Sequence, residues 1–186
     1  MTNILICGIG GQGTVLAAKL LDQAAIASGL PVHSAETIGM AQRGGSVTSH
    51  VRIGKECFSP LIPFGTADMI ISFEMCEAVR NLEYLKKGGT VIVNKKIMTP
   101  PASLLAGKSF EESAMLEALG KAAGKVVVID SDKICAELGS SKVVNTVLLG
   151  AAVKEGIEGI TKESVEDAIK ASVKPKFVEI NLKALG

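Results

Sequence analysis

Short apolar runs bounded by turn residues alternate with longer stretches of helical periodicity along the first two thirds of the chain. We expect strands at 3–7, 32–35, 46–53, 68–73, 90–94 and 125–129. We expect helices at about 14–28, 74–85 and 111–123, and another after 129 that Asp130, Ser131 or Asp132 would cap. This alternation predicts an α/β fold, a wound and largely parallel sheet flanked by helices.

The segment 46–53 alternates strictly between two kinds of side chain. Val47, Ser49, Val51 and Ile53 fall on one face, and Ser46, Thr48, His50 and Arg52 fall on the other. A period of two predicts a strand with one polar face. The segment before it, 36–45, is polar and rich in glycine, and we interpret it as a loop.

From Ser141 onward the pattern is helical only, with helices expected at 143–154, at 162–172 and from 176. Thr161 is the expected N-cap of the second of these helices, although a full capping box would place an acid one position after Glu163. The chain has no internal repeat. Residues 1–186 are therefore expected to form one domain with a helical C-terminal part.

Composition narrows the class of protein. Twenty basic and nineteen acidic residues give a net charge of +1, which provides no overall field for nucleic acid or anionic lipid. The aromatic content of 3% without tryptophan leaves few platforms for stacking bases. No stretch has the length of a membrane span and the start lacks a signal peptide, so we expect a cytoplasmic protein that binds neither nucleic acid nor membrane.

The four cysteines lie far apart in the sequence. Cys7, Cys57, Cys76 and Cys135 are separated by nineteen residues or more, and no CxxC pair is present. They are expected to be small buried side chains in a reducing compartment, with no metal site in this chain.

The first candidate site is a glycine-rich turn between the first expected strand and helix. Its functional residues are Gly8, Gly10, Gly11, Gln12 and Gly13, which follow the pattern G-x-G-x-x-G. In a Rossmann-like fold such a turn presents free backbone N–H groups to an anion. An acid expected about 20 residues on would hold a ribose, but that position is His33, and Glu36 opens the loop. A turn kept only for helix–strand packing is the alternative.

The second candidate site is the loop that follows. Its functional residues are Gly39, Met40, Gln42, Arg43, Gly44, Gly45 and Ser46, and Arg52 follows in the next strand. Arg43 and Arg52 are two of only three arginines, and guanidinium groups suit carboxylates and phosphates. A solvated loop is the alternative, which the apolar Met40 and Ala41 disfavour.

Other polar residues are expected to have structural roles. We expect His50 to be hydrogen-bonded rather than catalytic, and the chain has no G-x-S-x-G elbow. Asp68, Glu74 and Glu77 are interpreted as caps and surface charges. No catalytic residue is assigned.

These motifs together resemble a known family. The turn at 8–13 followed by 39–46 resembles the gamma-type domain of the 2-oxoacid:ferredoxin oxidoreductases. The stretches 40–47 and 49–52 look specifically like the beta subunit of the indolepyruvate enzymes. Further similar pieces occur at 67–68, 73–74, 77–78, 88–94 and 145–150, so that the resemblance covers nearly the whole chain.

The resemblance implies a subunit that takes part in oxidative decarboxylation of a 2-oxoacid, such as indolepyruvate, to an acyl-CoA. Electrons would pass to ferredoxin within the complex. A large partner subunit would carry thiamine diphosphate, Mg and 4Fe-4S clusters, since this chain has no Gly-Asp-Gly segment and no cluster cysteines. CoA would be a co-substrate, with the glycine loops lining its channel.

Two alternatives remain. The chain resembles, at the shared glycine turn, gamma subunits of pyruvate, 2-oxoglutarate or branched-chain 2-oxoacid oxidoreductases. It could instead be a nucleotide-binding regulatory module. Because the cofactors would lie in the partner subunit, the isolated chain is expected to be inactive. A domain that docks elsewhere should expose apolar surface, so a homodimer of the isolated chain is possible.

Overall fold

The computed structural model describes residues 1–38, 44–55, 57–99, 103, 105 and 110–186. Within these residues six strands form one sheet in the order β2-β3-β1-β4-β5-β6. The strands are β1 (Thr2–Ile9), β2 (Val32–Ile38), β3 (Ser46–Ile53), β4 (Ala67–Ser72), β5 (Leu85–Asn94) and β6 (Lys125–Ile129). The helices are α1 (Thr14–Ala27), α2 (Met75–Arg80), α4 (Glu112–Ala122), α5 (Ser131–Leu138), α6 (Val144–Glu155), α7 (Lys162–Ser172) and α8 (Pro175–Leu185), with 3-10 turns η1 (Leu82–Tyr84) and η2 (Ser141–Val143).

The sheet is largely parallel, as the sequence predicted. β1, β4, β5 and β6 are parallel neighbours. β3 pairs antiparallel with both β1 and β2, so β2 runs in the same direction as β1. Within the described residues β3 is therefore the single reversed strand of the sheet.

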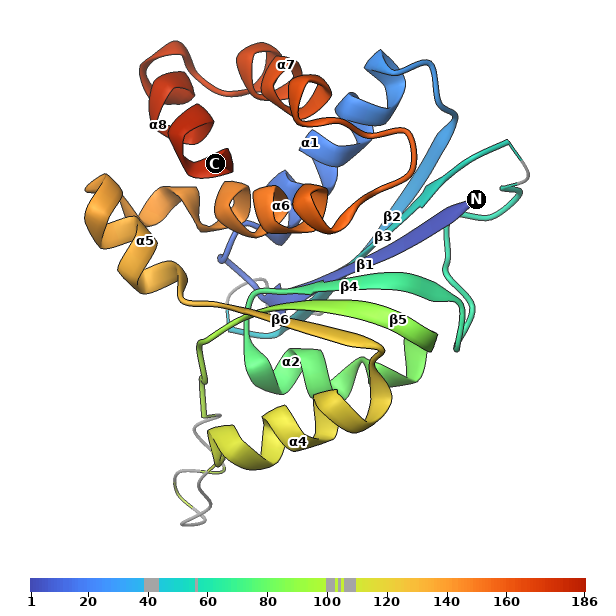
Figure 1. Cartoon of the computed structure of the whole chain (residues 1–186), viewed down its shortest axis with the longest axis vertical. Coiled ribbons are helices and arrows are strands. Elements are labelled where there is room, and N and C mark those ends of the chain that lie inside the picture. Colours follow the sequence, from blue (N-terminus) through green and yellow to red (C-terminus); the bar gives the residue numbers. More distant parts are fainter. Residues whose placement is uncertain (39–43, 56, 100–102, 104, 106–109) are drawn as a thin grey trace.

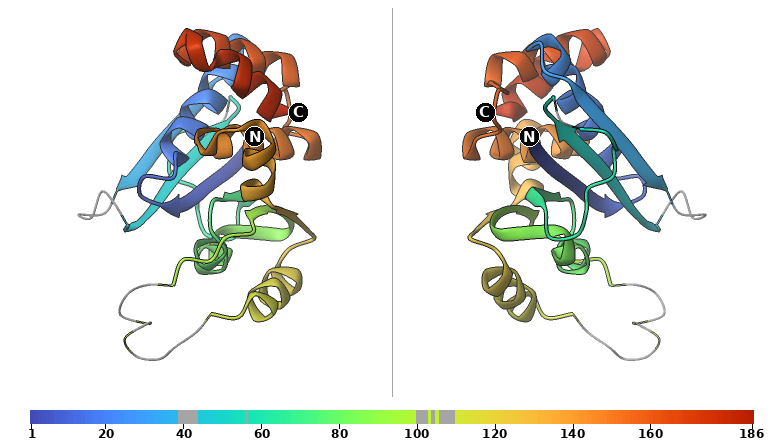
Figure 2. Two further views of the ribbon diagram at one scale, coloured as in Figure 1. Left: turned by 90° about the vertical axis from the view of Figure 1, so that its left-hand side faces the viewer. Right: turned by 90° about the vertical axis from the view of Figure 1, so that its right-hand side faces the viewer.

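Helices cover both faces of the sheet (Figure 1). One face of β1 directs Ile4 and Ile6 into a core with α1, α6 and α7. The other face directs Leu5 and Cys7 into a core with α2 and α4. Figure 2 shows the sheet edge-on between these layers, with the C-terminal helices α6 to α8 gathered on one side. The expected helical C-terminal part is confirmed.

Several element ends differ from the predictions. β2 continues to Ile38, and Glu36 lies inside it opposite Ser49, because pairing with β3 extends a segment whose polar sequence indicated a loop. The expected helix at 74–85 ends at Arg80, where the Asn81 side chain donates to the Glu77 carbonyl. β5 begins at Leu85, ahead of the strand predicted at 90–94, so the residues between 85 and 90 belong to the strand.

Helix caps follow the sequence closely. The Asp130 carboxylate caps α5 by accepting a 3.1 Å bond from the Lys133 N–H. Thr161 caps α7, and Ser164 completes a capping box by accepting from the Thr161 N–H at 3.1 Å. The expectation that this box needs an acid at its third position was wrong, because a serine hydroxyl reaches the same donor. None of the described helices has the length and apolar character needed to cross a bilayer.

Candidate functional site

The glycine turn connects the end of β1 to the start of α1. Gly11 and Gly13 have φ of 101° and 97°, a region in which side chains are strained, so glycine is required at both. Gly13 is the N-cap of α1 and contributes no side-chain cap bond. The first N–H groups of α1, with the helix dipole behind them, therefore point toward the turn.

Gly8 and Gln12 hold this turn together. A Cβ at Gly8 would lie 2.9 Å from the Phe73 Cβ, so the close approach of Phe73, which follows β4, requires glycine at position 8. The Gln12 Oε1 accepts a 2.7 Å bond from the Ile9 N–H and fastens the side chain across the turn. Gly8 and Gln12 thus act as packing residues of the turn, while Gly11 and Gly13 supply its open backbone.

The structure brings the two glycine-rich motifs into direct contact. The Gly10 N–H donates to the Gly45 carbonyl at 2.8 Å, and the Gly44 N–H donates to the Gly10 carbonyl at 3.3 Å. The Ser46 hydroxyl donates to a carboxylate oxygen of Glu77 at 2.5 Å, which ties the same loop to α2. Gly39, Met40, Gln42 and Arg43 lie outside the described residues.

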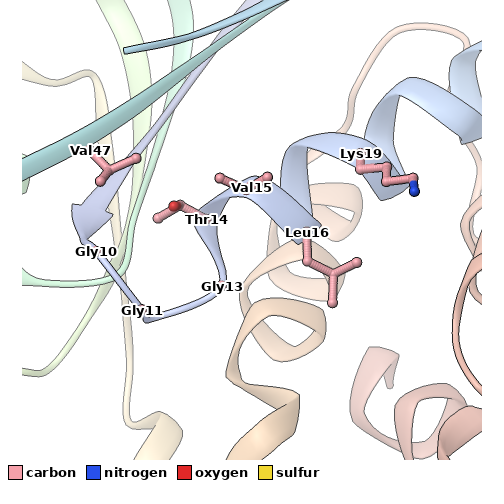
Figure 3. A pocket seen from close by; sticks show the side chains of 8 residues that line it. All are labelled: Gly10, Gly11, Gly13, Thr14, Val15, Leu16, Lys19 and Val47. Atoms are coloured by element: carbon pink, nitrogen blue, oxygen red, sulfur yellow. The ribbon is translucent and has the colours of Figure 1, made fainter. Parts of the chain in front are cut away.

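An open cleft of about 580 Å³ lies beside the joined turns. Its walls come from the end of β1, the first turns of α1 and the start of β3, as Figure 3 shows. Val15, Leu16 and Val47 make it mainly apolar, and Lys19 provides its one charged side chain among the described residues. Such a cleft suits a ligand or partner segment that is apolar with an anionic end.

Arg52 does not belong to this site. It pairs in the sheet with Asn3, whereas Ser46 pairs with Ile9, so Arg52 lies at the opposite end of β3 from the glycine turns. Its guanidinium donates to the Asn3 side chain at 2.9 Å and to the Ser59 carbonyl at 2.7 Å. The sequence predicted Arg52 in the site of the glycine loops; in the structure its donors hold the 57–61 segment against the sheet.

Two carboxylates are buried, contrary to their interpretation as surface charges. Glu74 is fully buried and Glu77 is 5% exposed. Glu74 does cap α2, as expected, by accepting from the Glu77 N–H at 2.9 Å, and it also accepts from the Met98 N–H at 2.8 Å. The Glu77 carboxylate receives the bonds from Ser46 and from Arg80, the latter at 3.1 Å. Both acids therefore position the loops around the turn.

His50 has the structural role that the sequence predicted. Its Nδ1 accepts a 3.2 Å bond from the Ile62 N–H, and burial lowers the pKa of the imidazole. The 59–62 segment thus covers the end of the polar face of β3 that carries His50 and Arg52. His33 is exposed on the edge strand β2, away from the glycine turn.

The cysteines are free thiols, buried except for the half-buried Cys76. Burial raises the pKa of Cys7 to about 12 and that of Cys76 to about 11, which disfavours the nucleophilic thiolate at neutral pH. No group of three or more His, Cys, Asp or Glu side chains suited to a metal ion occurs in the part of the chain that the structure describes.

The sequence did not indicate the residues of the cleft wall. Val15, Leu16 and Lys19 look like ordinary helix positions, and only the two exposed apolar residues at the start of α1 give a signal, since a first turn normally packs or is polar. The contact between the two glycine motifs was not derivable from spacing. It depends on β3 returning beside β1.

The fold and the joined glycine turns agree with one family of oxidoreductase subunits. The model of the pyruvate ferredoxin/flavodoxin oxidoreductase family matches residues 3–186, and the chain belongs to this family. The chain is 40% identical, over 187 residues, to the indolepyruvate oxidoreductase subunit IorB of Pyrococcus horikoshii, covering 98% of this chain and 91% of that protein. It is 34% identical to the common subunit gamma of the pyruvate/ketoisovalerate oxidoreductases of Thermococcus kodakarensis, covering 99% and 93%.

Solved structures share the fold. The gamma subunit of the keto/oxoacid ferredoxin oxidoreductase from Geobacter sulfurreducens superposes with a TM-score of 0.71 at 26% identity, covering 100% of this chain and 94% of that one. The pyruvate oxidoreductase subunit PORC from Thermotoga maritima gives a TM-score of 0.75 at 22% identity, covering 99% and 92%.

Proposed function

We propose that this chain is the small, cluster-free subunit of a 2-oxoacid:ferredoxin oxidoreductase that acts on indolepyruvate or related aryl pyruvates. The 40% identity to the indolepyruvate subunit of Pyrococcus horikoshii, over nearly the whole of both chains, supports this assignment. In the reaction, the 2-oxoacid is decarboxylated, its acyl group passes to CoA, and two electrons pass to ferredoxin.

A partner subunit would carry the redox cofactors. Cluster ligation needs several thiolates close together, but Cys7, Cys76 and Cys135 lie on β1, α2 and α5. The described residues do not fit a 4Fe-4S cluster, and they offer no carboxylate set for Mg and thiamine diphosphate. We therefore assign thiamine diphosphate, Mg and the clusters to the large subunit, and the isolated chain is expected to be inactive.

The joined glycine turns carry the proposal. The cleft beside them presents backbone N–H groups at the start of α1 and the Lys19 ammonium, set among apolar side chains. In the complex, the amides and Lys19 would hold an anionic group of CoA or of the 2-oxoacid, while Val15, Leu16 and Val47 exclude water. The proposed role of Arg43 beside the same anion stays a prediction.

The test uses the complex of this chain with its large subunit. Lys19→Ala is expected to raise the KM for CoA or for the 2-oxoacid about 5- to 50-fold with a smaller effect on kcat, because a charge-assisted contact is lost. Lys162→Ala, a change of an exposed lysine on α7, is the control. If Lys19→Ala and Lys162→Ala change the KM alike, or if the chain alone turns over substrate, the proposal that the cleft completes the active site of the complex is wrong.

A gamma subunit of a pyruvate or branched-chain 2-oxoacid enzyme is the second candidate. It is favoured by the 34% identity to the common gamma subunit of Thermococcus kodakarensis. Comparing kcat/KM of the complex for indolepyruvate, pyruvate, 2-oxoglutarate and a branched-chain 2-oxoacid decides between the two.

Phe58 and Phe64, which are 96% and 64% exposed, are the apolar surface on which the predicted self-association of the isolated chain would depend.

A further inference from the structure

A second, smaller cavity also borders the glycine turn. It encloses about 190 Å³ and is lined by Gly11 and Gln12 of the turn, by Asn94 at the end of β5, and by Ser131 after β6. It therefore lies outside the carboxyl ends of parallel strands, where α/β sheets bind ligands. Unlike the main cleft, it is mainly polar.

Three helices begin against this cavity. The turn leads into α1, Ser131 and Asp132 form the first turn of α5, and Val144 begins α6. In Figure 1 the glycine turn and the starts of α5 and α6 lie at the same end of the sheet. Neither α1 nor α6 has a side-chain cap on its first N–H groups. Each helix start carries a partial positive charge, about +0.5, so the cavity is electrostatically suited to an anion.

The second observation is a buried hydroxyl without a partner. Ser131 is 1% exposed and lines the cavity, and its hydroxyl makes no hydrogen bond within the described residues. Its N–H is satisfied by the Asn94 Oδ1 at 3.3 Å, so only the side chain remains available. Asn145, 3% exposed, also has an unpaired Nδ2, but it packs against Gly13 and is not part of the cavity lining. A buried hydroxyl such as that of Ser131 normally has a partner, which a ligand would supply.

The charged side chains around the cavity are compatible with an oxyanion. Lys96 lines it and lies 3.5 Å from the Asp132 carboxylate. Asp132 is 71% exposed in its side chain, so it can turn into solvent when an anion takes its place. The Asp130 carboxylate is already engaged by the Lys133 N–H. Lys96 and three helix starts then outweigh the two carboxylates.

We infer that this cavity is a binding site for the oxyanion group, phosphate or carboxylate, of a small molecule. Lys96 supplies the charge, the Ser131 hydroxyl donates, and the backbone at Gly11 and Asp132 closes around the group. The site shares Gly11 with the cleft of the proposed function, but Lys96 and Ser131 belong to this cavity and Lys19 belongs to the cleft. It stands on its own contacts, whether or not the chain acts on indolepyruvate.

The test is a titration of the full, ¹⁵N-labelled chain with inorganic phosphate and, separately, with acetate. Amide shifts are expected at Gly11, Asp132 and Val144, which line the cavity, and the tighter of the two anions identifies the source of the group. Lys96→Ala is expected to weaken binding by about tenfold. Lys95→Ala is the matched control, since Lys95 is similarly exposed but pairs with Glu112 outside the cavity, and it should change the affinity less than about twofold.

Ser131→Ala separates binding from folding. The hydroxyl has no partner in the free chain, so this variant should keep the melting temperature of the native chain and lose about threefold in phosphate affinity. Lys19→Ala, in the main cleft, should leave the shifts at Asp132 and Val144 unchanged, since neither residue lines that cleft. Absence of shifts at the three amides up to about 50 mM anion, or equal effects of Lys95→Ala and Lys96→Ala, overturns the inference.

Discussion

Cys7 lies near the C-terminal end of β1 with a fully buried side chain under α2. Its Sγ lies 3.6 Å from the Glu77 carbonyl oxygen. Burial, together with the smaller effect of the nearby Glu77 and Glu74 carboxylates, raises the pKa of the thiol from 9.0 to about 12. The neutral thiol is thus part of the folded core.

This shift predicts a loss of stability at alkaline pH. The folded pKa lies above the unfolded value, so the contribution of Cys7 is complete below about pH 9 and declines toward pH 12, by about 1.4 kcal/mol per pH unit at most. In urea unfolding, the difference in unfolding free energy between the native chain and Cys7→Ala should be constant from pH 7 to 8.5 and shrink by pH 10.5. A difference that stays constant to pH 10.5 would contradict the assignment.

At the residue scale, the sequence predicted backbone requirements better than side-chain environments. The turn glycines and the structural role of His50 follow from local pattern. The burial of Glu74 and Glu77 does not, because the groups that satisfy them, Ser46 and Met98, arrive from distant segments. The same holds for Arg52, because its partners Asn3 and Ser59 could not be predicted from the spacing of residues in the sequence.

At the element scale, the packing of α6 against α8 depends on the absence of a Cβ at one glycine. A Cβ at Gly150, within α6, would lie 2.2 Å from the Leu185 carbonyl oxygen of α8. Gly120, within α4, has nothing within 4 Å of the same position. The two glycines therefore form a matched pair in helix interiors.

Gly150→Ala is expected to destabilise the chain by about 1–3 kcal/mol, because α8 must move away from α6. Gly120→Ala should stabilise it by up to about 1 kcal/mol through helix propensity. Denaturant unfolding of both variants against the native chain measures the two effects. Equal stability of the two variants would mean that α8 does not pack on Gly150 in solution.

At the element scale, periodicity predicted nearly every helix and strand, including the bounds of β3, β6 and α7. The ends of β2 and β5 were wrong because strand pairing, and not local composition, sets them. Glu36 extends β2 since β3 offers it a partner, and Leu85 starts β5 since Ala67 pairs with it.

The strand order has a consequence for the whole molecule. In a dinucleotide-binding fold, the strand bearing the ribose-binding acid lies next to the first strand. Here β3 lies between β1 and β2, which displaces Glu36 by two strand spacings, about 9.5 Å, from the glycine turn strand. The pattern G-x-G-x-x-G is therefore present without its ribose partner.

We accordingly expect the chain to show no binding of NAD or FAD tighter than about 1 mM in calorimetry. The physical reason is that the turn can contact only the diphosphate of a dinucleotide, and no acid lies beside it to bind the ribose, so the affinity stays low. Micromolar binding of either dinucleotide would restore the nucleotide-binding regulatory module as the better description.

The α/β class, the sense of the sheet and the helical C-terminal part could be predicted for the whole molecule. The position of β3 could not, because a strand that inserts between its predecessor and β1 has the same alternating sequence as one that adds at the edge. The meeting of the two glycine motifs depends on that choice.

The bond from the Gly10 amide to the Gly45 carbonyl uses only atoms that nearly every amino acid carries. Proline at position 10 would delete the donor, whereas other replacements retain it. The linkage between the two motifs can therefore be kept while the surrounding side chains are replaced during evolution, so the lining of the cleft can change without altering the backbone that supports it.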